Sequence, residues 1–289
     1  MSRLIDAVTF GFLALLAVVA PPGRAADGPT TAPASRRAKD AAATRVLYVE
    51  GYPRWDYRYL VQWLARDRGV LSSVYLASAD PKATQPGDRP ISRVPETADE
   101  FAGYEVVILG DVDPRLLTDQ QMTLLARRVE AGAGLVMLAG ARHDPAAYRG
   151  TPLAAALPVE LPAEPARAGG VVKEGFQIVV TAEGKRSPCF RFRDDPASNE
   201  KALAELDPLF WSAAGVTAKP GATVWAVHPT PGADGKRAPL MVAGEHGKGR
   251  VLYIGFDDTW RWRRMAGEAS AFDAFWTGAI RAVAPPSRR

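Results

Sequence analysis

The sequence predicts an α/β fold, a three-layer sandwich in which a mostly parallel sheet is extended by antiparallel strands. In the first half of the chain, continuous apolar runs alternate with amphipathic runs of helical period. Continuous apolar strands are typical of a parallel sheet that is covered on both faces. In the second half, two apolar runs are joined by a glycine-rich turn, which indicates an antiparallel hairpin.

The first half reads as strand, helix, strand, loop, strand, helix and strand, an order typical of a flavodoxin- or Rossmann-like sandwich. In the first helix, Leu60, Trp63 and Leu64 recur at helical spacing. In the second helix, Thr118 and Gln121 have the spacing of a capping box. The expected strands are residues 45–51, 71–77, 104–114 and 134–140, and the expected helices are residues 55–69 and 118–132.

The second half contains shorter elements that we assign to the same domain. Residues 238–256 predict a hairpin because two apolar runs flank glycines. Residues 270–283 predict a final helix with one aromatic face. A short helix followed by an extended edge is expected over 151–161, and strands are expected over 175–184 and 222–229.

The N-terminal region has the composition of a signal peptide. Arg3 precedes an apolar stretch over residues 7–20, and Gly23 and Ala25 occupy the small-residue positions of a cleavage site. We therefore expect an exported protein, periplasmic or secreted, without a membrane span in the mature chain. An uncleaved segment that tethers the chain to the membrane is the alternative.

The expected organisation is a signal peptide (1–25), a disordered linker (26–44), one domain (45–284) and a short tail (285–289). The linker is rich in Ala, Pro, Thr and Ser and lacks apolar periodicity. We therefore expect a hydrophobic core only within residues 45–284.

Composition argues against several classes of function. The formal net charge of +4 is too balanced to suggest a nucleic-acid partner. Three scattered histidines do not suggest a metal site, and we expect no cofactor. The single cysteine, Cys189, excludes an intramolecular disulfide and lacks activating neighbours, so we expect a buried, inert thiol.

Polar residues follow the expected strands, where ligands bind in an open parallel sheet. If the last strand is parallel to the first, their carboxylates, guanidinium groups and indoles converge at one edge. Arginines there could hold a small polar ligand through bidentate contacts. The candidate ligand-binding residues are Arg54, Trp55, Asp56, Asp111, Asp257, Asp258, Trp260 and Arg261.

A structural reading of the same residues stays open. Aspartates after strands often cap the next helix, which would account for Asp56 and Asp111. Trp260 could belong to a stacked structural corner with nearby arginines. Asp257 and Asp258 are adjacent in an extended segment and are expected to point to opposite sides.

No common catalytic motif is found. The sequence has no G-x-S-x-G elbow, no C-x-x-C pair and no H-E-x-x-H helix. The stretch "GEHGKGR" lacks the spacing of a phosphate-binding loop, and a hairpin turn explains its glycines.

Several stretches together resemble class I glutamine amidotransferase-like domains. They include "RVLYVEGYPRWDYRYL", "YEVVILGDVDP" and "PLMVAGEHGKGRVLYIGFDDTWRWRR", in the order in which that family has them. The resemblance covers nearly the whole mature chain and is nearest to a bacterial exported or membrane-associated subgroup. It implies an envelope partner with von Willebrand factor A-like regions.

The chain departs from this family where its nucleophile would be expected. In the family a cysteine follows the strand that corresponds to residues 134–140, and here the position holds Ala141, Arg142 and His143. The resemblance therefore implies a non-catalytic domain that binds a small polar ligand or a partner protein. An enzyme of different chemistry, a hydrolase or sugar-modifying protein with Asp111 or Asp257 as general base, is the second hypothesis, and a purely structural envelope module is the third.

Overall fold

A computed structural model describes residues 43–143, 145–163, 174–264 and 270–286. The expected signal peptide, nearly all of the expected linker and part of the tail lie outside the described residues. No helix within the described ranges is long and apolar enough to cross a membrane.

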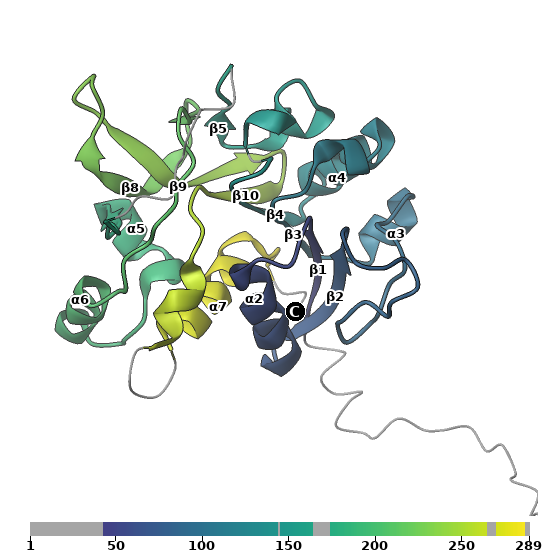
Figure 1. Cartoon of the computed structure of the whole chain (residues 1–289), viewed down its shortest axis with the longest axis horizontal. Helices are drawn as coiled ribbons and strands as arrows, with labels where there is room; N and C mark the ends of the chain where they lie inside the picture. The colour runs from purple at the N-terminus through teal and green to yellow at the C-terminus, as the bar shows by residue number, and fades with distance from the viewer. Residues whose placement is uncertain (1–42, 144, 164–173, 265–269, 287–289) are drawn as a thin grey trace, which may run out of the picture.

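The centre of the fold is a mixed sheet of eight strands in the order β2-β1-β3-β4-β10-β9-β8-β6 (Figure 1). The first five strands of this order are parallel, and β9, β8 and β6 extend them in antiparallel fashion. The predicted α/β fold class is therefore confirmed. The strands are β1 (Thr44–Glu50), β2 (Val70–Leu76), β3 (Val106–Leu109), β4 (Gly134–Leu138), β6 (Val179–Val180), β8 (Thr223–Pro231), β9 (Arg237–His246) and β10 (Gly249–Ile254).

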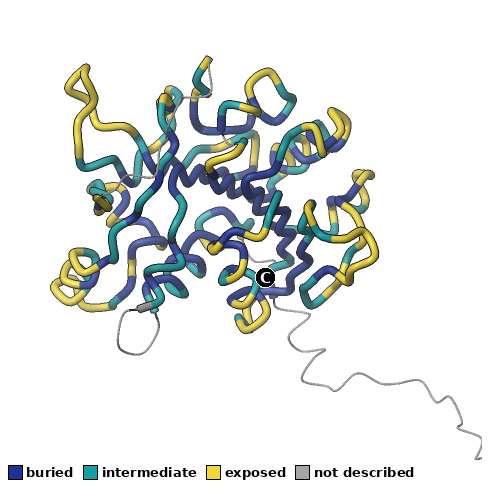
Figure 2. The backbone as a smooth tube through the Cα atoms, viewed as in Figure 1, coloured by how far each residue is buried: buried dark blue, intermediate teal, exposed yellow. Residues whose placement is uncertain are grey.

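Helices cover both faces of the sheet and bury two hydrophobic cores. Along β1, Val46 and Tyr48 enter one core while Leu47 and Val49 enter the other, as the alternation of a strand requires. The strands accordingly form the buried centre of the molecule in Figure 2. The first core packs under α2 (Trp55–Arg66), η4 (Pro188–Phe190), α6 (Pro196–Ala204) and α7 (Ala271–Val283), and the second under α3 (Ala98–Ala102), α4 (Asp119–Glu130) and η3 (Pro152–Ala156).

Most predicted elements form where expected, including the capping box of Thr118 and Gln121. The strand predicted over 175–184 is an exception, since only Val179–Val180 pairs with β8. Thr181 accepts a hydrogen bond from the Gly184 amide and starts the short helix α5 (Ala182–Arg186). The remaining elements are η1 (Pro114–Leu116), η2 (Ala146–Tyr148), β5 (Val159–Glu160), β7 (Thr217–Ala218) and η5 (Thr259–Arg264).

A glycine in the middle of α7 allows close packing against η4. A Cβ atom at Gly278 would lie 2.3 Å from the Pro188 carbonyl oxygen and 2.6 Å from the Cα of Cys189. Cys189 is completely buried beneath this contact. The absence of a side chain at Gly278 therefore sets the distance between α7 and η4.

Replacing Gly278 with alanine should destabilise the protein, although alanine favours helices. The overpacked contact should lower the free energy of unfolding by about 1–3 kcal/mol, which outweighs a helix-propensity gain of about 1 kcal/mol. Thr277→Ala, at a half-buried neighbour in the same helix, should change stability by no more than ~0.5 kcal/mol. Urea denaturation measures both, and a Gly278→Ala variant as stable as wild type would contradict the packing account.

Candidate functional site

The polar segments after β1, β3, β4 and β10 lie at one edge of the sheet because these four strands are parallel. We call this the strand-end edge. The N-terminus of α2 and the short helix η5 also lie there, since they follow β1 and β10 in the chain. The structure therefore brings together segments that are about 200 residues apart.

The Arg54 guanidinium is the centre of this edge and is almost fully buried, with 8% of the residue exposed. Its Nε donates to Glu50 Oε2 at 2.9 Å, and its Nη1 lies 3.2 Å from Asp257 Oδ2. Nη1 and Nη2 also donate to the carbonyl oxygens of Ala139 (2.6 Å) and Leu138 (3.2 Å). Arg54 thus connects β1, β4 and the segment after β10.

Burial alone would lower the pKa of Arg54, but the Glu50 and Asp257 carboxylates outweigh it and raise that pKa well above its ordinary value. Glu50 also accepts hydrogen bonds from the Tyr48 hydroxyl (2.7 Å) and the Gly51 amide (2.9 Å). The buried charge is therefore permanent and fully paired.

Glycine at the end of β3 leaves room for this ion pair. β3 lies between β1 and β4 in the sheet, so the link from Glu50 through Arg54 to β4 passes the end of β3. A Cβ atom at Gly110 would lie 2.3 Å from Glu50 Oε2. Any side chain at this position would displace the carboxylate from Arg54.

Asp56 is fully buried and holds the first turn of η5 in place. Its carboxylate accepts hydrogen bonds from the Thr259 hydroxyl at 2.7 Å and the Trp260 amide at 2.8 Å. Burial and the neighbouring Asp257 carboxylate raise the pKa of Asp56 well above that of an ordinary aspartate. Asp56 therefore keeps its proton at pH values where exposed aspartates are ionised.

Asp257 has the opposite shift. Burial would raise its pKa, but the Arg54 guanidinium and the hydrogen bonds from Asp56 and the Asp258 amide outweigh it, and the pKa of Asp257 is lowered. Asp56 and Asp257 thus form a pair in which Asp56 carries the proton and Asp257 is ionised.

The carboxylates of Asp257 and Asp258 have different partners. Asp258 has a positive φ of 77°, a conformation that aspartate adopts more readily than most residues. Its carboxylate accepts from the Phe210 amide at 3.2 Å and from Trp260 Nε1 at 3.0 Å. Arg261 Nε lies 3.6 Å from the same carboxylate. Asp258 therefore shapes the turn into η5.

Asp111 organises the loop after β4. Its carboxylate accepts from the amides of Arg142 and His143, each at 2.8 Å, and from the Tyr52 hydroxyl at 3.0 Å. A Cβ atom at Gly140 would lie 2.3 Å from the Asp111 Cβ, so glycine is needed for this approach. These contacts hold the segment that follows β4 against the segment that follows β3.

The outer surface beside the strand-end edge carries Trp55, Tyr59 and Trp260, which we call the aromatic cluster. Their ring centroids lie 5.5–6.0 Å apart. The guanidinium of Arg263 lies 3.3 Å from the Tyr59 ring centroid, and that of Arg58 lies 5.4 Å from the Trp55 ring centroid. Trp55 is 54% exposed, so the aromatic cluster presents a large indole face to solvent.

The predicted site residues divide into two groups. Inside the edge, Asp257 contacts both Arg54 and Asp56, and Asp111 and Asp258 fix neighbouring loops. The second group is outside and comprises Trp55, Trp260 and Arg261, whose guanidinium lies 4.6 Å from the Trp260 ring centroid.

The candidate ligand-binding residues leave out Tyr59, which belongs to the aromatic cluster, and Arg58 and Arg263, which border it. Tyr59 follows Trp55 by one helical turn, and this spacing could have placed it on the same face. Arg58 and Arg263 carry no comparable signal, because the sequence does not show over which ring an arginine lies.

Neither a metal nor a reactive thiol is indicated among the described residues. No group of three or more His, Cys, Asp or Glu side chains in those ranges could hold a metal ion. Burial raises the pKa of the Cys189 thiol far above its usual value, and Cys189 packs under α7. This thiol is therefore protonated and shielded from solvent.

Replacing Arg54 with methionine should leave buried carboxylates without their partner. We expect the free energy of unfolding to fall by about 3–5 kcal/mol. The matched control is Arg58→Met, since Arg58 is exposed one turn along the same helix; its loss should stay below about 1 kcal/mol. Equal losses in the two variants, measured by urea denaturation, would show that Arg54 is not a structural centre.

The raised pKa of Asp56 gives stability a definite dependence on pH. Between the unfolded pKa of about 4 and the higher folded pKa of Asp56, the unfolded chain releases a proton that the folded chain retains. Wild type should therefore lose stability relative to Asp56→Asn as pH rises, by at most about 1.4 kcal/mol per pH unit.

Chemical denaturation between pH 5 and 8 measures this difference. Asp113→Asn is the control, because the Arg115 guanidinium lowers the pKa of Asp113 to about 2 and so its difference from wild type should be constant in this range. The quantity to follow is the free energy of unfolding of wild type minus that of Asp56→Asn, which should fall as pH rises. If it stays constant or increases with pH, the proton is not on Asp56.

Comparison with known proteins supports the fold only. No family model matches the chain. No curated protein is similar to it. Two cytoplasmic proteins of Salmonella typhimurium have similar solved structures, each at 18% identity over 83% of this chain, with TM-scores of 0.57 and 0.53 and coverage of 100% and 99% of their own chains. A ThuA-like protein from Bacteroides uniformis matches at 11% identity over 88% of this chain and 94% of its own, with a TM-score of 0.43.

Proposed function

We propose that the chain is an exported, non-catalytic class I glutamine amidotransferase-like domain that binds a small polar ligand at the aromatic cluster. The observation that carries this proposal is the exposure of Trp55, 54%, beside an edge whose charged groups are paired within the protein. In a binding role the exposed rings contact the ligand, and the buried ion pairs hold the segments that carry those rings in place.

The geometry around the expected elbow supports a non-catalytic role. The residues after β4 are Ala141, Arg142 and His143, and the amides of the last two bind Asp111. Cys189, the one cysteine, lies in η4 and is buried against α7, and burial raises the pKa of its thiol. Covalent glutamine hydrolysis needs an accessible thiolate, which these residues do not supply.

The chemistry of the aromatic cluster favours a ring-shaped ligand with an acidic group. A flat indole such as that of Trp55 packs against the apolar face of a sugar ring. Arg58 and Arg263 border the cluster and offer guanidinium donors to a carboxylate. An acidic saccharide combines both features. A partner protein, such as the envelope protein that the family resemblance implies, is the alternative occupant.

An enzyme of different chemistry is the second candidate, and the Asp56–Asp257 pair favours it. Opposed pKa shifts in two neighbouring carboxyl groups are typical of acid–base pairs. Asp257 keeps 20% of its side chain exposed, whereas Asp56 is fully buried. This second candidate would be supported if wild type converts a saccharide and the Asp257→Asn variant folds but does not convert it.

Binding of an acidic oligosaccharide tests the proposed function. Ligand-observed NMR titration with tetragalacturonate should detect binding by wild type, and neutral cellotetraose should bind more weakly because it lacks the carboxylates. Trp55→Ala should weaken tetragalacturonate binding about tenfold, which corresponds to about 1.4 kcal/mol.

The control variant is Leu116→Ala, because Leu116 is similarly exposed, at 59%, but lies in η1 outside the aromatic cluster. It should bind like wild type. Equal binding by the Trp55→Ala and wild-type proteins, or no binding of either saccharide, would reject the assignment of the aromatic cluster to an acidic saccharide.

A further inference from the structure

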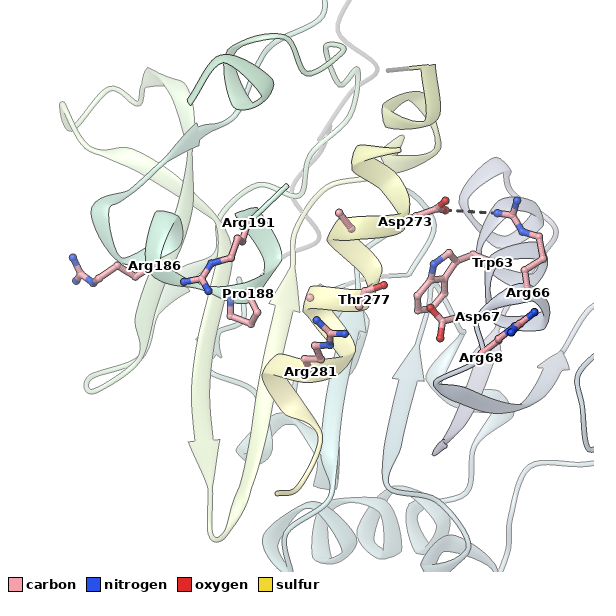
Figure 3. A pocket seen from close by; sticks show the side chains of 12 residues that line it. Trp63, Arg66, Asp67, Arg68, Arg186, Pro188, Arg191, Asp273, Thr277 and Arg281 are labelled. Atoms are coloured by element: carbon pink, nitrogen blue, oxygen red, sulfur yellow. Dashed lines mark ion pairs between the residues drawn. The ribbon is translucent and has the colours of Figure 1, made fainter. Parts of the chain in front are cut away.

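A second surface feature lies away from the strand-end edge, along the outside of α7. A cavity of about 840 Å³ lies between the C-terminal end of α2, the middle of α7 and the segment around η4 (Figure 3). Trp63, Pro188 and Gly278 contribute its apolar lining. We call it the α7 groove. Its volume lies in the range of small-molecule sites.

Positive charge dominates this groove. Five arginines line it against two aspartates, Asp67 and Asp273, which leaves a formal charge of +3. The arginines come from four separate segments, so their convergence is a property of the fold rather than of one charge run. They are Arg66, Arg68, Arg186, Arg191 and Arg281.

Part of this charge is already compensated. Arg66 lies 3.6 Å from Asp273, an ion pair drawn in Figure 3. Arg186 lies 3.1 Å from Glu183. Asp67 accepts a hydrogen bond from the Gly69 amide at 2.7 Å. These contacts account for both acids of the groove and for two of its arginines.

The other three arginines, Arg68, Arg191 and Arg281, are exposed, and no ion pair or hydrogen bond to them is found among the described residues. A position in the last turn of α7 explains Arg281, because a cation is favourable at a helix C-terminus. It does not explain Arg68 or Arg191, which lie outside regular helices. The three exposed guanidinium groups make this surface electropositive, which favours the approach of an anion.

We propose that the α7 groove binds a ligand with clustered phosphate groups. Guanidinium groups match phosphate oxygens through paired N–H donors, and several of them around one cavity suit a multiply charged anion better than a single carboxylate. The cavity is larger than one phosphate, and its apolar lining provides a surface for the rest of the ligand. The same chemistry occurs in free polyphosphates and in anionic lipid headgroups.

The test compares the full chain with a variant in which the three unpaired arginines are changed together, Arg68→Gln, Arg191→Gln and Arg281→Gln. Inorganic pyrophosphate, titrated by calorimetry, probes the free ligand. Co-sedimentation with phosphatidylglycerol vesicles, with phosphatidylcholine vesicles as reference, probes the headgroup. Wild type should bind in at least one of these arms, and binding should weaken as salt increases.

The triple variant should lose at least about tenfold in affinity, since each arginine–phosphate contact is a charge-assisted hydrogen bond. Arg237→Gln, at an exposed arginine of β9 outside the groove, is the control for the loss of a surface arginine elsewhere and should bind like wild type. Binding of pyrophosphate alone identifies a free phosphate ligand, and binding of phosphatidylglycerol alone identifies a headgroup.

Two results would overturn the proposal. One is the absence of binding by wild type in both arms. The other is a triple variant that folds with an unchanged melting temperature and binds as tightly as the Arg237→Gln control. Every protein in the comparison carries the same N-terminal apolar segment, so the difference in vesicle binding between the triple variant and the Arg237→Gln control reports on the groove.

Discussion

The buried guanidinium of Arg54 is the interaction on which the strand-end edge depends. It joins Glu50 at the end of β1 to the carbonyl groups at the end of β4 and to Asp257 after β10. The connection passes the end of β3, where Gly110 leaves space for the Glu50 carboxylate. One side chain therefore fixes three strand ends, and its loss would leave the buried Glu50 carboxylate without its guanidinium partner.

The buried residues of α2 and η5 stabilise the strand-end edge, and the exposed residues of the same two helices form the surface beside it. In α2, Asp56 faces η5 while Trp55 faces solvent. In η5, Thr259 is buried on Asp56 while Trp260 joins the aromatic cluster. The positive φ of Asp258 lies at the turn that directly precedes Thr259 and Trp260. The arrangement of the exposed rings is thus a consequence of the buried hydrogen bonds, which explains why charged and aromatic residues share such short stretches of sequence.

The sequence predicts the fold well because apolar continuity and capping residues act locally, as at Thr118 in α4. It also predicts that the strand ends converge, since this follows from parallel pairing. It does not show which polar groups turn inward: Arg54 is buried and Arg58, one turn later, is exposed. That difference depends on Glu50 and Asp257, whose approach is set by tertiary structure. The same limit applies to the arginines of the α7 groove, which come from separate segments.

Arg54 and Asp257 act as one structural unit rather than as separate ligand-binding groups. A double-mutant cycle with Arg54→Met and Asp257→Asn measures their coupling through the free energy of unfolding. The account predicts a coupling energy of about 1–3 kcal/mol, because each single variant already breaks the shared contact. Effects that add to within ~0.5 kcal/mol would contradict it, since they would mean that the two side chains stabilise the fold independently.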